Sequence, residues 1–271
     1  MIVKQFIMQH SQRLARIDVE LLLCEALAVP RSWLLAHDLD ELSEADAARA
    51  NTLIARRQQG EPVAHILGRR DFWDFSLEVT PATLIPRPDT EVIVEAALAR
   101  IGHHAKVADI GTGTGAIAIA IARECPSATV FAGEFSLAAA QLAQRNIANN
   151  APQKVSLWQG SWLAAIADNS LDMIVSNPPY IDQNDQHLSE GDVRFEPLSA
   201  LVADNSGLAD IQQIAQQAKV VLKPGGWLLL EHGWDQAVRV AELLQELGYK
   251  KVQGVRDYGG NDRVTLGRRP C

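Results

Sequence analysis

Apolar residues recur with two different periods along the chain, and the change of period marks its parts. In the first 70 residues the spacing is that of an amphipathic helix, at positions Leu14, Ile17, Leu21 and Leu22. Pro30 ends this helix, and Ser43 is placed to cap another that runs over residues 47–58. The pattern predicts a small helical N-terminal domain over residues 1–70.

A segment with a two-residue period follows the helical region. Phe75, Leu77 and Val79 alternate with polar residues, as in a half-buried strand. With one further strand, this segment would form a β-hairpin linker over residues 71–88.

Two prolines then set the start of the next helix. Pro86 and Pro88 exclude a helix before Asp89, because the residue that precedes a proline disfavours helical torsion angles. Asp89 or Thr90 is expected to cap a helix that runs to about Arg100.

From residue 89 to residue 271, strand-like and helix-like segments alternate. Strands are expected near residues 106–110, 129–132, 155–159, 171–176, 227–231, 251–256 and 263–268. Helices are expected near residues 116–124, 137–149, 207–221 and 236–247, with a turn at residues 223–226. This alternation predicts an α/β fold, in which an open, mostly parallel sheet of seven strands carries helices on both faces.

Composition and charge narrow the classes of function. The chain has a net charge of −8 and a pI near 5.4, and an acidic chain disfavours non-specific binding to nucleic acid, which depends on neutralising phosphates. The longest apolar run, residues 116–122, is too short to span a bilayer, and no signal-peptide pattern is present. Three distant cysteines and the absence of metal-binding spacings predict a cytoplasmic protein that holds no metal.

A glycine-rich loop between a strand and a helix predicts a nucleoside cofactor. The loop has the spacing GxGxG, and Asp109 precedes it in the strand, where a pyrophosphate would be repelled. Glu134 ends the next strand, where an acid can accept hydrogen bonds from ribose hydroxyls. Asp109 could instead brace the loop, and Glu134 could be a solvated acid. S-adenosylmethionine, leaving as S-adenosylhomocysteine, fits best with a predicted site formed by Asp109, Gly111, Thr112, Gly113, Thr114, Gly115 and Glu134.

The tetrapeptide Asn177-Pro178-Pro179-Tyr180 follows the apolar segment 171–176. An amide nitrogen is a poor nucleophile because its lone pair is delocalised into the carbonyl. The Asn177 side chain and the proline-rich backbone offer carbonyl acceptors for its two N–H groups, and Tyr180 offers a flat face. The same tetrapeptide could simply be a turn. The glycine loop, Glu134 and Asn177 are expected at one carboxyl edge of the sheet, which favours a ligand site.

These motifs resemble those of the HemK/PrmC methyltransferases, which methylate the glutamine amide in the Gly-Gly-Gln motif of class I peptide chain release factors. The resemblance covers nearly the whole chain and includes residues 84–91, 191–197 and 257–263. It implies a Rossmann-like class I methyltransferase, active as a monomer, whose N-terminal helical domain docks the release factor. It also implies that residues 111–115 line the methionine and ribose, that Glu134 holds the ribose and that Trp162 lies near the adenine. Asn177 would contact both cofactor and substrate, and residues 177–180 would grip the glutamine.

The chain departs from the family pattern at two places, and three alternatives stay open. The ribose acid is usually aspartate where this chain has Glu134, and an acid often stands where this chain has Gly160 and Ser161. We expect catalysis to be retained, with weaker cofactor binding. The alternatives are a ribosomal-protein glutamine methyltransferase, an adenine-N6 nucleic-acid methyltransferase and a non-catalytic binding protein.

Overall fold

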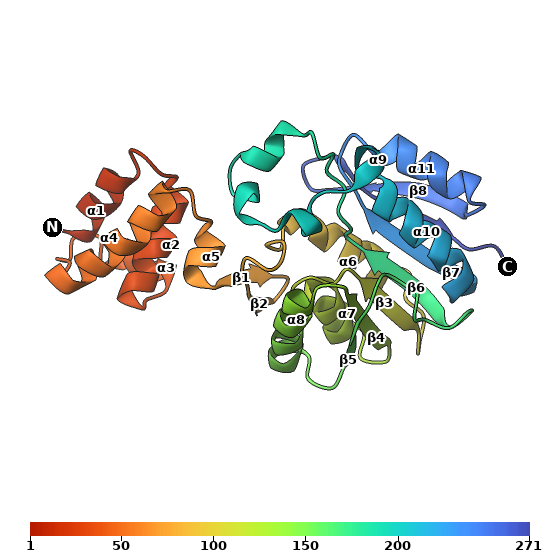
Figure 1. Cartoon of the computed structure of the whole chain (residues 1–271). Helices are drawn as coiled ribbons and strands as arrows, with labels where there is room; N and C mark the ends of the chain where they lie inside the picture. The colour runs from red at the N-terminus through yellow and green to blue at the C-terminus, as the bar shows by residue number, and fades with distance from the viewer. The chain divides into compact units, whose positions relative to one another are not determined.

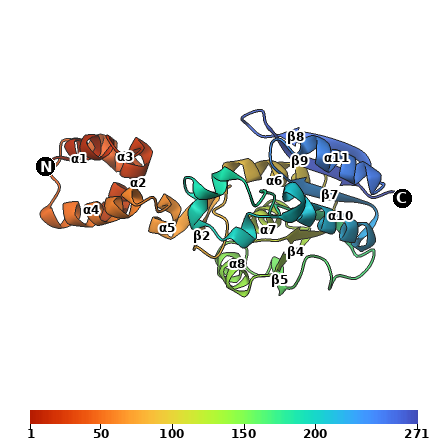
Figure 2. The same ribbon diagram turned by 45° about the horizontal axis from the view of Figure 1, so that its top comes forward.

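The computed structural model describes residues 1–271, which form two compact units. The first comprises residues 1–69 together with 189–195, and the second comprises residues 70–188 together with 196–271. Figures 1 and 2 show the elements of both units. No helix in either unit combines the length and the apolar character needed to cross a membrane.

The first unit is helical, as predicted. Its helices are α1 (Val3–His10), α2 (Arg16–Leu27), α3 (Arg31–Ala36), α4 (Glu44–Gln58) and α5 (Val63–Leu67). Its core contains Phe6, Leu22 and Ile54, and Ser43 caps α4 as expected by accepting from the Asp46 N–H. Ile17 is exposed, however, because α2 is apolar on most sides and spacing alone does not select its buried face.

A segment distant in sequence completes this unit. Asp192 accepts a hydrogen bond of 2.7 Å from Arg57, which also pairs with Asp18 at 2.8 Å. The Arg194 guanidinium donates to the Gln59 carbonyl. Residues 189–195 therefore pack with the N-terminal helices, although they were predicted to belong to the α/β domain.

The second unit is built on a seven-stranded sheet. Its strands are β3 (Lys106–Ile110), β4 (Thr129–Glu134), β5 (Val155–Gln159), β6 (Leu171–Ser176), β7 (Leu222–Glu231), β8 (Lys250–Arg256) and β9 (Asp262–Arg268). The strand order is β5-β4-β3-β6-β7-β9-β8, and only β9 runs antiparallel to its neighbours. A separate hairpin pairs β1 (Arg69–Phe72) with β2 (Phe75–Glu78). The mostly parallel sheet and the hairpin confirm the predicted α/β fold.

Helices cover both faces of the sheet (Figure 1). One core joins the sheet to α6 (Glu91–Leu98), α7 (Ala116–Glu124) and α8 (Leu137–Asn150). The opposite core joins it to α10 (Ala209–Val221) and α11 (Ala237–Glu246), which follow the short helix α9 (Asp204–Gly207). Successive residues of β6 alternate between the two cores, because a strand directs them to opposite faces: Met173 and Val175 join the first core, and Ile174 joins the second. Both faces are thus buried, which explains the continuous apolar runs of these strands.

Two local predictions are wrong. Residues 223–226 do not separate a helix from a strand: β7 already starts at Leu222, and its pairing with β6 shifts register across them. Neither Asp89 nor Thr90 caps α6 through its side chain; both lie in the short 3-10 helix η1 (Pro88–Thr90). The Thr90 side chain is buried and bonded elsewhere.

Candidate active site

The glycine loop between β3 and α7 has a backbone that other residues rarely adopt. Gly111, Gly113 and Gly115 have φ angles of 70°, 56° and 87°, in the left-handed region that glycine enters without strain. A methyl group on Gly111 would lie 3.3 Å from the Trp162 ring. The loop therefore needs glycine both for its turn and for the close approach of Trp162.

Asp109 lies beneath this loop. Its side chain is buried, and one carboxylate oxygen accepts from the Thr112 hydroxyl at 2.5 Å and from the Ala118 N–H at 3.2 Å. Burial raises the pKa of Asp109 to about 7, against the lowering effect of these two hydrogen bonds. In the structure this carboxyl braces the loop and the start of α7, which is the alternative role that its position in the sequence allowed.

Glu134 ends β4 and faces the loop from the next strand. One of its oxygens accepts from the Gly113 N–H at 2.9 Å, and the other accepts from the N–H groups of Phe135 and Ser136. The glutamate is long enough to reach back to the glycine loop. A carboxylate has about four acceptor positions, so capacity remains for a ligand hydroxyl.

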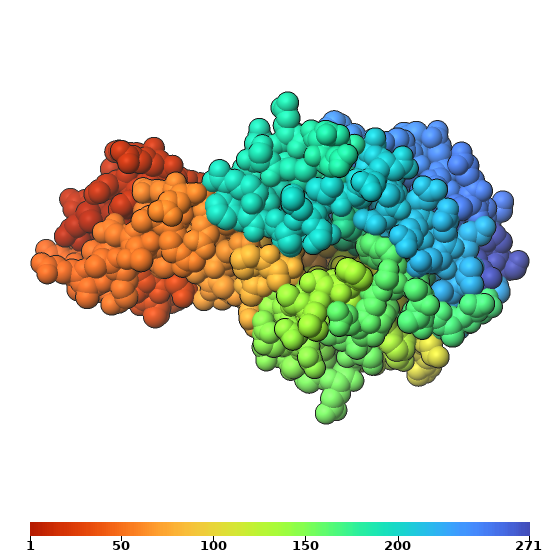
Figure 3. All heavy atoms as spheres, viewed as in Figure 1, coloured from red at the N-terminus to blue at the C-terminus, as the bar shows by residue number.

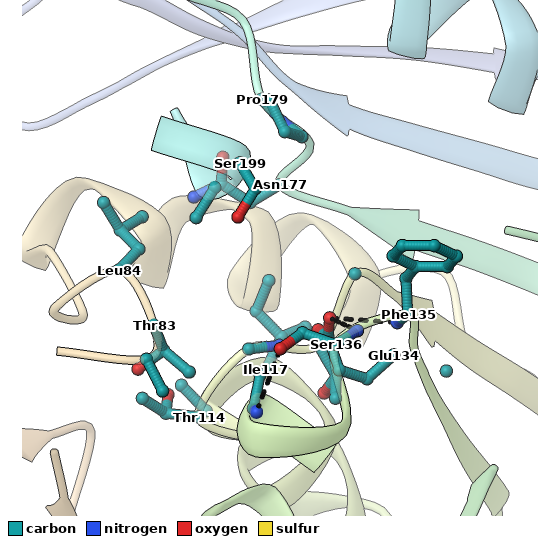
Figure 4. Close-up of a pocket in the computed structure, with 18 of the residues that line it drawn as sticks. Thr83, Leu84, Thr114, Ile117, Glu134, Phe135, Ser136, Asn177, Pro179 and Ser199 are labelled. Carbon is teal, nitrogen blue, oxygen red and sulfur yellow. Dashed lines mark hydrogen bonds between the residues drawn. The ribbon is translucent and has the colours of Figure 1, made fainter. Parts of the chain in front are cut away.

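A cavity of about 350 Å³ lies between these elements. Figure 3 shows the surface of the second unit hollowed between the region of α8 and the segment that follows Leu198. Eight of the predicted site residues line the cavity: Gly111, Thr112, Gly113, Thr114, Glu134, Trp162, Asn177 and Pro179. In Figure 4, Glu134, Phe135 and Ser136 lie across the cavity from Asn177, Pro179 and Ser199.

Four predicted residues do not line this cavity: Asp109, Gly115, Pro178 and Tyr180. Pro178 is buried and Tyr180 is partly buried. Burial raises the pKa of the Tyr180 hydroxyl, the negative charge of Glu231 adds to the rise, and Arg263 opposes it. The Tyr180 hydroxyl is thus held among charged groups rather than in the cavity.

The backbone of the Asn-Pro-Pro-Tyr segment is fixed from two sides. The Leu201 carbonyl accepts from the N–H groups of Tyr180 and Ile181. The Tyr180 carbonyl accepts from the Gln236 side chain at 2.8 Å. Gly207 lies so close that a methyl group added there would overlap the Tyr180 carbonyl oxygen. The segment therefore cannot shift without moving α9 and the start of α11.

The Asn177 side chain meets a buried pair of residues that the sequence analysis missed. Its amide nitrogen donates to the Thr90 hydroxyl at 3.4 Å, and the Thr90 hydroxyl donates to Glu231 at 3.2 Å. Burial raises the pKa of Glu231 to about 7, while hydrogen bonds from Thr90 and Asn177 and the charge of Arg263 oppose the rise. Glu231 is an acid at the end of an apolar strand, as Glu134 is. This pattern in the sequence could have identified Glu231 as a candidate site residue.

The segments that carry the family resemblance are joined by ion pairs in the second unit. Arg87 pairs at 2.8 Å with Glu196, whose side chain is buried. Arg263 pairs with Asp257 at 3.2 Å and contacts Asp89 at 3.5 Å. Arg87 and Arg263, which are far apart in sequence, thus both lie near the Tyr180 hydroxyl, whose pKa they act to lower.

The fold and site define a class I methyltransferase. Residues 3–68 match the family described as PrmC N-terminal domain, and residues 88–192 match the methyltransferase small domain. A solved methyltransferase from Pyrococcus furiosus superposes with a TM-score of 0.57 and 21% identity, over 80% of this chain and 98% of its own. A ribosomal protein L11 methylase from Lactobacillus delbrueckii subsp. bulgaricus gives 0.53 and 20%, over 70% and 82%. Such low identities establish the shared fold.

Much more similar sequences establish the family. The release factor glutamine methyltransferase of Vibrio cholerae is 50% identical over 93% of this chain and 89% of its own length. The Escherichia coli protein of the same name is 48% identical over 93% and 92%, and that of Xylella fastidiosa is 45% identical over 96% and 95%. The chain belongs to the release factor glutamine methyltransferase family, which confirms the resemblance found in its motifs.

Proposed function

We propose that this protein transfers a methyl group from S-adenosylmethionine to the side-chain amide nitrogen, N5, of the glutamine in the Gly-Gly-Gln motif of class I release factors. One observation carries the proposal: Asn177 and Pro179 line the same cavity as the glycine loop and Glu134. A grip for a planar amide and a cradle for a nucleoside thus share one space. The names of relatives that are 45–50% identical over most of their length support the choice of substrate.

The residues of the loop fit the cofactor. Gly111 and Gly113 expose their backbone because they carry no side chain, and Glu134 offers acceptors for ribose hydroxyls. Trp162 and Phe135 supply apolar surface beside them for a purine ring. When bound, S-adenosylmethionine supplies an electrophilic methyl group on a sulfonium.

The Asn-Pro-Pro-Tyr segment orients the amide nitrogen of the substrate. The Asn177 side-chain oxygen would accept one of its two N–H groups, and the backbone carbonyl of Pro178, whose ring is buried outside the cavity lining, would accept the other. Tyr180, which also lies outside the lining, would support the segment. Positive charge develops on this nitrogen as the new N–C bond forms, so both acceptors bind the transition state more strongly than the ground state. The proton becomes acidic only as the bond forms and leaves afterwards. It then passes to solvent, so no base need act on the amide before the transfer; the ionisable side chains that line the cavity are Glu134 and Asp210.

The helical first unit would dock the release factor, and the protein would act in the cytoplasm as a monomer. Residues 1–70, 71–88 and 89–271 would serve as docking domain, linker and methyltransferase domain. We expect no direct contact with nucleic acid, given the net charge of −8.

A transfer assay with labelled S-adenosylmethionine tests the substrate. Purified class I release factor is expected to take up label, and release factor whose Gly-Gly-Gln glutamine is replaced by alanine is expected to take up none. Ribosomal protein and DNA serve as parallel acceptors. Preferential labelling of either would reject the release factor as substrate and favour the corresponding alternative.

A further inference from the structure

Asn177 can assist the reaction only in one of the two orientations of its amide. An asparagine amide presents a carbonyl oxygen on one side and an NH₂ group on the other, and a rotation of 180° exchanges them. With the oxygen toward the cavity, Asn177 accepts from a substrate amide. With the NH₂ group there, two donors would face each other. A grip on an amide therefore needs something that fixes this rotation.

The Thr90 hydroxyl determines which side of the Asn177 amide faces the cavity. A hydroxyl has one proton to donate and lone pairs that accept. Its proton goes to the Glu231 carboxylate at 3.2 Å, so Thr90 can only accept from Asn177, at 3.4 Å. An acceptor at this position selects the NH₂ group of Asn177 and leaves the oxygen for the cavity, which Asn177 lines.

Glu231 maintains this orientation of the Asn177 amide only while its carboxyl group is ionised. A carboxylate accepts and cannot donate, whereas a protonated carboxyl can donate to Thr90 and release the threonine proton toward Asn177. The charged groups that face Glu231 are Arg263 from β9 and Asp89 from η1, and the Tyr180 hydroxyl lies near. Burial of the carboxyl and Asp89 favour protonation, and Arg263 opposes it.

We infer that Thr90 and Glu231 are positioning residues that hold the Asn177 amide with its oxygen toward the substrate. Both are buried. Thr90 also borders the cavity, whereas Glu231 lies outside the cavity lining, so Glu231 acts through Thr90 and Asn177 and not by touching the substrate. The inference rests on the proposed function, because it assumes that Asn177 accepts an N–H of the substrate.

A matched pair of variants tests the hydroxyl. Thr90→Val keeps the shape and removes the hydroxyl, whereas Thr90→Ser keeps the hydroxyl. At saturating cofactor and release factor, we expect Thr90→Val to lower kcat by roughly 10- to 100-fold and Thr90→Ser to lose far less. Calorimetric affinity for S-adenosylmethionine should stay within about threefold of wild type in both, since neither removes a predicted cofactor contact.

The carboxylate is tested through its titration. With the pKa of Glu231 near 7, single-turnover rates of the wild type should fall as pH drops below about 7. Glu231→Gln keeps an oxygen that can accept from Thr90 but cannot titrate, so this fall should disappear whatever the level of its plateau. If Thr90→Val does not fold, as judged by its melting curve, the pH profile of Glu231→Gln decides.

The failures can be told apart. Equal kcat values for Thr90→Val and Thr90→Ser overturn the role of the Thr90 hydroxyl, and an unchanged acid limb in Glu231→Gln overturns the role of the carboxylate, in each case while the wild type still methylates glutamine. A wild type that labels no glutamine overturns the proposed function itself.

Discussion

The two ends of the cavity are built in different ways. At the cofactor end, Asp109, Thr112 and Gly113 lie within five residues of one another, and Glu134 from the adjacent strand bonds the loop directly. At the amide end, Asn177 bonds Thr90, 87 positions away, and Thr90 bonds Glu231, 141 positions away. The first end depends mainly on a local strand, loop and helix, and the second depends on the whole fold.

Under the proposed function, this difference separates two tasks: one end of the cavity binds the cofactor, and the other aligns the substrate amide. The cofactor end offers backbone groups and one carboxylate, whose contacts would hold the ligand equally before and during reaction. Under the proposed function, the amide end would offer acceptors that bind more strongly as charge develops on the substrate nitrogen. Changes at the first end should therefore act on affinity, and changes at the second on kcat.

The largest effect is expected from Asn177→Ala, which removes the side-chain acceptor for the substrate amide. Loss of one such preorganised group lowers rates by about 10²- to 10³-fold, so we expect turnover to fall by at least that much. The measurement is the initial rate of release factor methylation, with affinity for S-adenosylmethionine and the melting temperature as controls. A rate near that of the wild type would remove Asn177 from the mechanism.

Gly207→Ala tests how strictly the amide end must be held. The new methyl group would overlap the Tyr180 carbonyl oxygen, and Gly207 has a φ of 80°. We expect kcat to fall roughly tenfold or more, because a displacement of about 1 Å can cost 10²-fold. The left-handed backbone alone should lower the free energy of unfolding by about 1–3 kcal/mol.

Gly248→Ala is the matched control for that strain. Gly248 has a similar φ of 87°, but nothing lies within 4 Å of the position of its added methyl group. It should lower the melting temperature and leave the methylation rate intact. Equal rates in the two variants would show that the Tyr180 carbonyl tolerates displacement.

The contrast between the two ends also explains what the sequence could predict. The GxGxG spacing and the acid at the end of β4 specify a loop whose contacts are local, and Gly111, Gly113 and Glu134 do line the cavity. The partners of Asn177 were missed because strand order and helix packing bring Thr90 and Glu231 together. Thr90 was interpreted as a helix cap, which is a common local role of threonine. In the structure its hydroxyl instead donates to the buried carboxylate of Glu231.

Glu134→Ala should act on affinity instead of rate. Loss of a charged acceptor is expected to weaken S-adenosylmethionine binding by roughly tenfold or more, while kcat at saturating cofactor changes little. Titration calorimetry and a rate measured at high cofactor concentration separate the two. Glu134→Asp restores the residue usual in the family and should bind more tightly than wild type if the extra methylene weakens the site. A selective loss of kcat in Glu134→Ala would contradict the division between the two ends.

The smallest effect on turnover is expected at Asp109, whose titration acts on the stability of the fold. The pKa of Asp109 is raised by burial from 3.8 in the unfolded chain to about 7, so the folded state takes up its proton more readily. The preference of the folded state for protonated Asp109 contributes to the free energy of unfolding. That contribution is fully present below about pH 3.8 and is lost as pH rises through 7. Asp109→Asn is neutral at every pH. Its melting temperature relative to wild type should therefore rise by roughly 5–10 °C between pH 5 and pH 8, because about two pH units at about 1.4 kcal/mol each act at about 2–4 °C per kcal/mol.

Asp172→Asn provides a control of opposite sign. Burial acts to raise the pKa of Asp172, but the Lys106 N–H and the Lys223 ammonium outweigh it and lower the pKa below its ordinary value. Its ionised form therefore stabilises the fold above the unfolded pKa of 3.8, and this contribution is lost as pH falls below that value. The melting temperature of Asp172→Asn relative to wild type should drop as pH rises through 4. If Asp109→Asn followed the same course, the carboxyl beneath the glycine loop would be stabilised in its charged form. Its bonds to Thr112 and Ala118 would then outweigh its burial, and the loop would depend on that charge.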